Sequence, residues 1–451
     1  MSQPVSYRVV GNVGVITIDN PPVNAFSHAV RKGLHDTMSD AIADATGIVL
    51  IVCAGRTFVA GADISEFGKP PADPWLPEVL DNIENSPKPV VTAVHGTALG
   101  GGFELVLASH YRCAIASAKV GLPEVHLGLL PGAGGTQRAP RLAGVQAALE
   151  LMTSGRPISA GKARAVGLLD EVFDDDLESN ALAWCEKLLA EGETPVKVSE
   201  RTVPAPEAGL FDAARDQLKK RARGQLAPFK IVDCVEAATR LDFAQGSEFE
   251  RESFLECMAS PQSAAMRHLF FAEREAAKVH DLPKSTGIRD IRSVAVIGGG
   301  TMGGGIAMSC ANVGLAVTLL EVDDAALERG FGVIEGNYAK TVKKGRLSPE
   351  EAEARRGRIA GTTDYGDLAD VDLVIEAVFE DPELKKTIFK KLDGVCKPGA
   401  ILATNTSYQD VDAIAAVTQR PADCLGLHFF SPANVMKLLE VVRGEKTADD
   451  V

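Results

Sequence analysis

Short apolar segments alternate with glycine-rich turns and helical stretches over about the first 190 residues. Val15–Ile18, Ile48–Val52 and Val90–Val94 are short and rich in β-branched residues, which is typical of buried strands. Strands that alternate with helices generally pack in layers. Residues 1–190 are therefore predicted to form an α/β domain.

The pattern changes to helices between residues 191 and 290. Phe211–Arg223 and Glu248–Cys257 have the mixed charge of exposed helices, and no glycine-rich motif occurs here. In His268–Val279 the apolar residues fall at helical spacing, which predicts a helix that packs back on the preceding domain. The polar segment His280–Arg292 is typical of a linker. Residues 191–290 are thus predicted to be a helical linker that packs partly on the first domain.

From about residue 291 the pattern is strand, glycine turn, helix and strand. Val294–Ile297 is a short apolar strand, and the next strand, Leu315–Leu320, ends at Glu321. Between them lies a GxGxxG motif made by Gly298, Gly300 and Gly303. The motif alone is weak, but a strand–turn–helix–strand unit with an acidic residue at this place predicts a Rossmann dinucleotide-binding domain over residues 291–451.

The predicted cofactor of this domain is NAD. The glycines allow a tight turn and let a pyrophosphate approach the helix N-terminus, and Thr301 and Met302 complete the motif there. Glu321 is expected to accept hydrogen bonds from the adenosine ribose and to repel a 2′-phosphate, which favours NAD over NADP. The alternative is an α/β unit with a glycine turn and no nucleotide.

Two glycine-rich turns in the first domain are candidates for binding a ligand by its oxygen. Phe58–Ile64 carries small residues in a row, and Gly100–Leu105 follows a strand and opens an apolar helix. N–H groups at the start of a helix lack partners and point along the helix dipole. One N–H group from each turn could form an oxyanion hole for a thioester that becomes an enolate, although such turns often serve only to reverse the chain.

Glu104 and Glu124 are candidates for acid–base chemistry. Glu104 is one turn into an otherwise apolar helix, which suggests burial, and Glu124 follows Gly121-Leu-Pro. Either residue alone would more often be a surface or capping carboxylate. Two carboxyls in one apolar pocket would have raised and divergent pKa values, which suits one as base and one as acid near neutral pH.

The composition restricts the classes of function. Hydrophobic residues make up 45% of the 451 residues and the formal net charge is −14. A chain this acidic is a poor candidate for binding nucleic acid. The eight cysteines form no CxxC pair, which argues against a metal site or a disulfide framework and for a reducing compartment. No secretory signal and no apolar stretch of membrane-spanning length is visible.

Four motifs in the first domain resemble a known family. They are NPPVNAF at residues 20–26, FVAGADI at 58–64, ALGGGFEL at 98–105 and VGLPEVHLGLLPGAGGTQRAPRLAG at 120–144. Together they resemble the signature region of the crotonase superfamily, the enoyl-CoA hydratases and isomerases. The resemblance implies a spiral of ββα units and an acyl-CoA thioester substrate.

The crotonase resemblance implies a role for each candidate residue. The N–H groups of Ala62 and Gly101 would form the oxyanion hole. Glu104 would orient and activate a water molecule, and Glu124 would deliver a proton to the α-carbon of a 2-enoyl thioester. Family members that only shift double bonds often keep one of these glutamates. The pair therefore favours hydration, with Δ3,Δ2-isomerase activity left open.

Three stretches of the last domain resemble the 3-hydroxyacyl-CoA dehydrogenases. They are VDLVIEAVFEDPELKK at residues 371–386, ATNTS at 403–407 and GLHFFSPANVMKLLEVV at 426–442. Without its motif, His428 would more often be a core histidine. The resemblance implies that His428 takes the hydroxyl proton of the substrate, that Glu440 orients this imidazole, and that Ser407 hydrogen-bonds the substrate oxygen. The residues at positions that contact the cofactor are Glu380, Lys385 and Asn405.

The order of the parts resembles the bifunctional enoyl-CoA hydratase/3-hydroxyacyl-CoA dehydrogenases of fatty acid β-oxidation, without their C-terminal helical domains. This implies hydration and then NAD-dependent oxidation to 3-ketoacyl-CoA, with oxidation expected to be weak in a chain that stops soon after Glu440. A fragment that binds acyl-CoA and NAD without turnover is the alternative. The expected location is the bacterial cytoplasm, or the peroxisome for a eukaryotic source. No motif specifies an oligomeric state.

Overall fold

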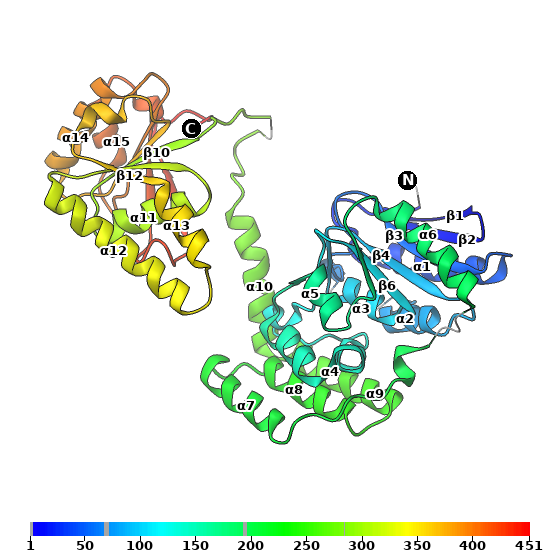
Figure 1. Cartoon of the computed structure of the whole chain (residues 1–451). Helices are drawn as coiled ribbons and strands as arrows, with labels where there is room; N and C mark the ends of the chain where they lie inside the picture. The colour runs from blue at the N-terminus through cyan, green and yellow to red at the C-terminus, as the bar shows by residue number, and fades with distance from the viewer. Residues whose placement is uncertain (1–2, 67–71, 193–195, 284) are drawn as a thin grey trace. The chain divides into compact units, whose positions relative to one another are not determined.

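The computed structural model describes residues 3–66, 72–192, 196–283 and 285–451. It divides the chain into two compact units, Met1–Lys278 and Val279–Val451 (Figure 1). None of the helices in the described residues is long and apolar enough to cross a bilayer. Both units are α/β, as predicted.

The first unit is built around a six-stranded sheet. The strand order is β1-β2-β3-β4-β6-β9, and every neighbouring pair is parallel except β1 with β2. Its central strands are almost continuously apolar and buried, as expected for parallel strands that are covered on both faces. The strands are β1 (Val5–Val10), β2 (Val13–Ile18), β3 (Ile48–Cys53), β4 (Val90–Val94), β6 (Tyr111–Ile115) and β9 (Glu171–Phe173).

A small second sheet brings the two predicted glutamate motifs together. It contains β5 (Thr97–Leu99), β7 (Lys119–Gly121) and β8 (Ile158–Ser159), with β5 parallel to β7. At its end the N–H of Gly100 donates to the carbonyl of Gly121 at 2.9 Å. The chain continues from β5 into α3 (Gly101–Ala108), and from β7 into the 3-10 helix η2 (Glu124–Leu127). Glu104 and Glu124 therefore start from neighbouring strands.

Helices cover the two sheets of the first unit. The ones before residue 200 are α1 (His28–Ala43), α2 (Leu76–Glu84), α4 (Gly135–Ser154), α5 (Ala160–Ala165) and α6 (Leu177–Glu191), with the short η1 (Ile64–Glu66) and η3 (Val198–Glu200). Four more follow, namely α7 (Leu210–Arg221), α8 (Ala227–Ala238), α9 (Phe243–Ala259) and α10 (Pro261–Ala276). Among these, α8 and α9 pack against α4 (Figure 1).

The structure divides the chain elsewhere than at the predicted boundary near residue 190. The first compact unit extends to Lys278, so most of the predicted linker 191–290 belongs to it. The physical reason is that Ile231, Val232 and Cys257 are fully buried in the same hydrophobic core as the first 190 residues. Only the part after Lys278 is separate from that unit.

Residues 268–279 were predicted to pack on the first domain, but the structure leaves two of their large apolar side chains exposed. The contact of α10 is made by its first turns, where the hydroxyl of Ser263 donates to the carbonyl of Leu127 at 2.9 Å. Further along, Leu269 is 58% exposed and Phe271 45% exposed. Apolar residues at consecutive positions, as in Leu269–Phe271, point around the helix and do not form one buried stripe.

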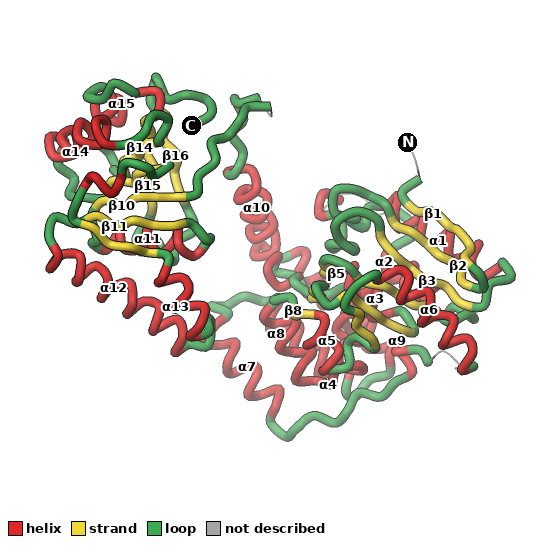
Figure 2. The backbone as a smooth tube through the Cα atoms, turned by 45° about the horizontal axis from the view of Figure 1, so that its top comes forward, coloured by secondary structure: helices red, strands yellow, loops and turns green. Residues whose placement is uncertain are grey.

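The second unit is a seven-stranded Rossmann sheet with the order β12-β11-β10-β13-β14-β15-β16 (Figure 2). All neighbouring strands are parallel except β15 with β16. The order reverses between β10 and β13, and ligands of such sheets bind at that switch point. The strands are β10 (Ser293–Ile297), β11 (Ala316–Leu320), β12 (Ile359–Thr362), β13 (Leu373–Glu376), β14 (Ile401–Thr404), β15 (Cys424–Phe429) and β16 (Leu439–Arg443).

Helices lie on both faces of this sheet (Figure 2). Ile306 of α11 (Thr301–Asn312) and Ile334 of α12 (Asp324–Lys343) are buried in the core of one face. Phe389 of α14 (Pro382–Val395) is buried in the core of the other. The remaining helices are α13 (Pro349–Gly357), α15 (Val411–Ala415), η4 (Tyr365–Leu368) and η5 (Pro421–Asp423).

Candidate active sites

Gly100 forms the turn between β5 and α3, where the first candidate site lies. Its φ of 54° and ψ of −130° are accessible in practice only to glycine. A methyl group at the next residue, Gly101, would lie 3.8 Å from the backbone nitrogen of Ala62. The predicted pair of N–H groups is therefore brought together, at the start of α3 and beside the bridge between Phe26 and Ala62.

Glu104 is 3% exposed and lies in a helix whose residues are all buried. One of its carboxylate oxygens, Oε1, accepts the N–H groups of Ala133 and Gly135 at 2.8 and 2.9 Å. Burial raises the pKa of Glu104, and the two N–H donors and the charge of Arg138 oppose that rise. A carboxyl held in this way can take up and return a proton without leaving its place.

Glu124 reaches the same turn from the other side. A methyl group on Gly100 would lie 3.0 Å from Oε1 of Glu124. Its Oε2 is buried and has no hydrogen-bond partner among the residues that the structure describes. Burial, and after it the negative charge of Glu104, raises the pKa of Glu124 well above its usual range. Of the two carboxyls, Glu124 is therefore the better proton donor at neutral pH.

Another carboxyl, Glu250 on α9, is buried and binds the same backbone segment as Glu104, and the sequence analysis missed it. It is 2% exposed and accepts the N–H groups of Gly134 and Thr136 at 2.6 and 2.9 Å. The sequence around it, EFERE, is typical of an exposed charged helix. The available signal was that the small residues Gly246, Ser253 and Cys257 share its helix face, since all of them are buried with it.

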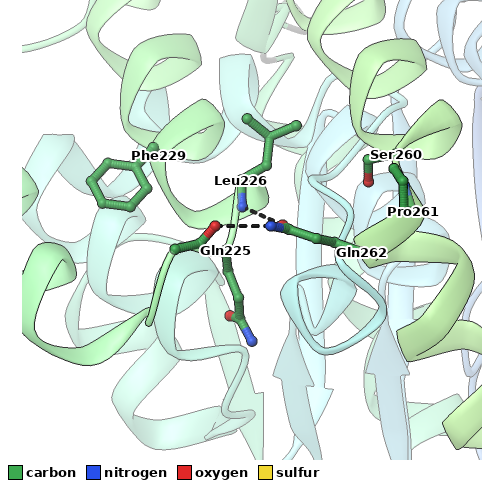
Figure 3. Close-up of a pocket in the computed structure, with 7 residues that line it drawn as sticks. Gln225, Leu226, Phe229, Ser260, Pro261 and Gln262 are labelled. Carbon is green, nitrogen blue, oxygen red and sulfur yellow. Dashed lines mark hydrogen bonds between the residues drawn. The ribbon is translucent and has the colours of Figure 1, made fainter.

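A surface hollow near the start of α10 has no features of an active site (Figure 3). It is lined by seven residues, among them Leu226, Phe229 and Gln262, and none of the seven is ionisable. The side chain of Gln262 accepts the N–H of Leu226 at 2.7 Å and donates to the carbonyl of Gly224 at 2.9 Å. Its polar atoms are thus used within the fold, and no predicted site residue lines it.

The glycine turn of the second unit has the geometry that a pyrophosphate requires. Gly298 has a φ of +95°, and a methyl group on Gly303 would lie 1.8 Å from the carbonyl oxygen of Gly298. A methyl group on Gly300 would meet nothing within 4 Å. Gly303 therefore serves the close approach of helix and strand, whereas Gly300 leaves the backbone beside Thr301 and Met302 open. These residues fit a bound dinucleotide.

Glu321 at the end of β11 faces the glycine turn. One of its carboxylate oxygens accepts the N–H of Gly299 at 2.6 Å, and the other accepts the N–H of Val322 at 2.9 Å. Each oxygen keeps a further lone pair for a ribose hydroxyl. The predicted acid is thus oriented by backbone groups next to the turn.

The predicted cofactor residues after β13 form one cluster around Lys385. Lys385 is fully buried, and its Nζ lies 2.8 Å from Glu376 Oε1 and 3.4 Å from Glu380 Oε2. Glu380 also accepts the N–H of Ser407 at 2.8 Å. The positive charge of the buried Lys385 thus balances the negative charges of Glu376 and Glu380. Glu376, at the end of β13, is a member of the cluster that the sequence analysis did not single out.

His428 and Glu440 are cross-strand neighbours on β15 and β16. Nδ1 of His428 lies 2.8 Å from Oε2 of Glu440. This contact fixes the orientation of the imidazole ring and leaves Nε2 as the nitrogen that can exchange a proton with a ligand. Asn405 connects this pair to the preceding cluster, because its Oδ1 accepts the N–H of Phe429 at 2.9 Å. The predicted dehydrogenase residues therefore gather around the carboxyl ends of β13, β14 and β15.

Fold and sites together define a chain of two parts, a crotonase-like unit followed by a dinucleotide-binding unit. Residues 8–207 match the family model described as enoyl-CoA hydratase/isomerase. Residues 293–451 match the model described as 3-hydroxyacyl-CoA dehydrogenase, NAD binding domain. The two parts of the chain thus match the two families that their motifs predicted, enoyl-CoA hydratase/isomerase and 3-hydroxyacyl-CoA dehydrogenase.

Curated relatives match across both domains. The peroxisomal bifunctional enzyme of Danio rerio is 45% identical over 97% of this chain and 61% of its own length. The enzyme of the same name from Homo sapiens is 41% identical over 96% of this chain and 61% of its own length. The peroxisomal fatty acid β-oxidation multifunctional protein MFP2 of Arabidopsis thaliana is 37% identical over 97% of this chain and 63% of its own length. The chain thus spans somewhat over three fifths of these relatives.

Proposed function

We propose that the first unit catalyses the hydration of 2-trans-enoyl-CoA to 3-hydroxyacyl-CoA, a step of fatty acid β-oxidation. The observation that carries the proposal is the position of Glu104 and Glu124. Two carboxyls with raised pKa values, the buried Glu104 and the half-buried Glu124 with its buried Oε2, flank the Gly100 turn beside the N–H groups of Ala62 and Gly101.

The proposed mechanism gives each of these groups one task. The N–H groups of Ala62 and Gly101 hold the thioester oxygen as it gains negative charge, a contribution of about 10²–10³ in rate per donor. Glu104 takes a proton from water while the water oxygen bonds to the β-carbon. Glu124 then gives its proton to the α-carbon, in accord with its higher pKa. Proton exchange restores both carboxyls.

For the second unit, NAD-dependent oxidation of the 3-hydroxyacyl-CoA is proposed. When bound, NAD would accept the hydride from the substrate. His428 would take the hydroxyl proton at Nε2, because Nδ1 faces Glu440 at 2.8 Å. Ser407 would hydrogen-bond the substrate oxygen, and Glu380, Lys385 and Asn405 would line the cofactor site.

Product analysis distinguishes hydration from an isomerase-dominated activity. The chain is incubated separately with a 2-trans-enoyl-CoA and with the matching 3-enoyl-CoA, and products are identified by NMR. Hydration predicts the 3-hydroxyacyl-CoA as the main product of the 2-enoyl substrate. Rapid formation of 2-enoyl-CoA from the 3-enoyl substrate, with little 3-hydroxy product from either, would favour the isomerase. Binding of both thioesters without conversion would favour a fragment without turnover.

Glu321→Gln should weaken the discrimination against NADP. The amide keeps one acceptor oxygen and loses the hydrogen bond to one of the two backbone N–H groups. It also removes the negative charge that faces a 2′-phosphate. Two like charges at 4 Å cost about 1 kcal/mol in water, so NADP affinity should rise by roughly fivefold or more. Dissociation constants for NAD and NADP, measured by calorimetry on parent and variant, test this. An unchanged ratio would show that Glu321 does not face the ribose.

The place of action follows the relatives in this proposal. The names of these relatives place them in peroxisomes. For a eukaryotic source we propose the peroxisome, and for a bacterial source the cytoplasm. The acyl-CoA thioester is the proposed small-molecule partner.

A further inference from the structure

One short backbone segment binds two buried carboxylates from two different helices. Alternate N–H groups of residues 133–136 donate to Glu104 (from 133 and 135, at 2.8 and 2.9 Å) and to Glu250 (from 134 and 136, at 2.6 and 2.9 Å). The hydroxyl of Thr136 donates to Glu250 as well. The segment thus connects a residue of the candidate active site to one on α9, far along the chain.

We propose that Glu250 is a positioning residue for the hydration reaction. It holds segment 133–136 in the conformation in which the N–H groups of Ala133 and Gly135 donate to Glu104. The inference rests on the proposed hydratase function, in which Glu104 activates water.

The packing of α9 fixes where the Glu250 carboxyl can lie. A methyl group on Gly246, one turn before Glu250, would lie 2.1 Å from Oε1 of Gln137 on α4. Helix α9 therefore approaches α4 as closely as a glycine allows. With its side chain 2% exposed, Glu250 takes its hydrogen bonds from segment 133–136 in place of water.

The charges around Glu250 couple it to the reacting carboxyls. It faces Glu104 on α3, Glu124 on η2 and the thiol of Cys234 on α8, while Arg138 on α4 acts on Glu104. Burial, and then the charge of Glu104, raises the pKa of Glu250 to about 8. With a pKa of about 8, Glu250 is mostly protonated below pH 7. An uncharged residue at position 250 would therefore act on Glu104 mainly through the position of segment 133–136.

Glu250→Gln is the main test, with crotonyl-CoA as substrate. Glutamine keeps the shape but places an N–H₂ group against a backbone donor, so segment 133–136 must shift. We expect kcat to fall by up to about 10²-fold, as for a small misplacement of a catalytic group, with a smaller change in KM. The acidic limb of the kcat/KM profile should move to higher pH, because Glu104 would lose the N–H donors that hold its pKa down.

Two further variants complete the kinetic test. Glu252→Gln makes the same replacement at an exposed position of α9 and should match the parent. Thr136→Val removes the hydroxyl that donates to Glu250 but keeps both N–H groups. It should move the acidic limb in the same direction by less, which keeps the test usable if Glu250→Gln does not fold. Unchanged kcat and an unchanged acidic limb in folded variants would overturn the proposal.

A stability measurement tests the proposal without relying on activity. Because the pKa of Glu250 is raised on folding, the folded state binds more protons than the unfolded state between the ordinary glutamate pKa and about 8. The parent therefore loses stability from this group as pH rises through that window, and Glu250→Gln does not. The Tm of Glu250→Gln minus that of the parent should increase from pH 5 to pH 8.

The outcomes separate this proposal from the proposed hydratase function. A folded parent that does not hydrate crotonyl-CoA would contradict the hydratase function. In that case the crystal structure of Glu250→Gln decides the positioning role. Displacement of segment 133–136 from Glu104 would support it. An unmoved segment, or a Tm difference that is the same at pH 5 and pH 8, would overturn it.

Discussion

Replacing Glu124 by Gln should lower kcat for the hydration of crotonyl-CoA by about 10²–10⁴, the usual contribution of a general acid. The amide fits the same space but has no proton of suitable acidity to give to the α-carbon. Its Oε2, buried and without a partner in the described residues, marks the place where substrate or water is expected. KM should change far less, because the thioester oxygen is held by Ala62 and Gly101.

The matching variant Glu104→Gln should cause a loss of similar size for a different reason. Glutamine cannot accept a proton from water, whereas its amide oxygen can still accept the N–H groups of Ala133 and Gly135. Glu150→Gln, on the exposed side of α4, is the control and should leave kcat unchanged. Retention of most hydration by either site variant, with isomerisation intact, would argue for a one-glutamate mechanism.

Gly303→Ala should abolish measurable NAD binding and destabilise the second unit. The added methyl group would lie 1.8 Å from the carbonyl oxygen of Gly298, so the turn between β10 and α11 has to open. Overpacking of a well-packed site costs about 1–3 kcal/mol, and here backbone rather than a flexible side chain must move. Calorimetric titration with NAD and thermal unfolding of the ligand-free chain measure the two effects.

Two other glycines separate the effect on folding from the effect on binding. Gly300→Ala meets nothing within 4 Å, so the ligand-free chain should keep its stability while NAD binding weakens. Gly336→Ala, inside α12 and equally free of contacts, should bind NAD like the parent and be slightly more stable. Normal NAD binding by Gly303→Ala would contradict the proposed cofactor site.

Much of the fold and of the sites could be predicted because short sequence patterns and motifs determine them. The strand at residues 90–94 and the helix that ends at Asn312 have the predicted bounds. The motif around Gly298 predicted a Rossmann domain, and the strand order of the second unit reverses between β10 and β13 as in such domains. His428 and Glu440 could be paired from the motif alone, and the structure brings them together by placing them opposite each other on two strands.

Features that depend on packing between distant segments could not be predicted. Glu250 has an ordinary helical neighbourhood, and only the contact of α9 with α4 makes it a buried partner of Glu104. The helices after residue 190 show no glycine motif, yet Ile231 and Val232 complete the first core. Lys385 was expected at the cofactor, and its burial under Glu380 depends on how α14 packs on the sheet.

The most direct test of the hydratase assignment is a single absorbance experiment. Crotonyl-CoA is added to the purified, folded chain, the absorbance of the conjugated enoyl thioester is recorded, and NAD is then added while reduced nicotinamide is followed. We predict that the enoyl absorbance falls in the parent, and hardly at all in Glu104→Gln and Glu124→Gln. Reduction of NAD after this fall would extend the account to His428 and Glu440. No loss of enoyl absorbance from the folded parent would contradict the central claim.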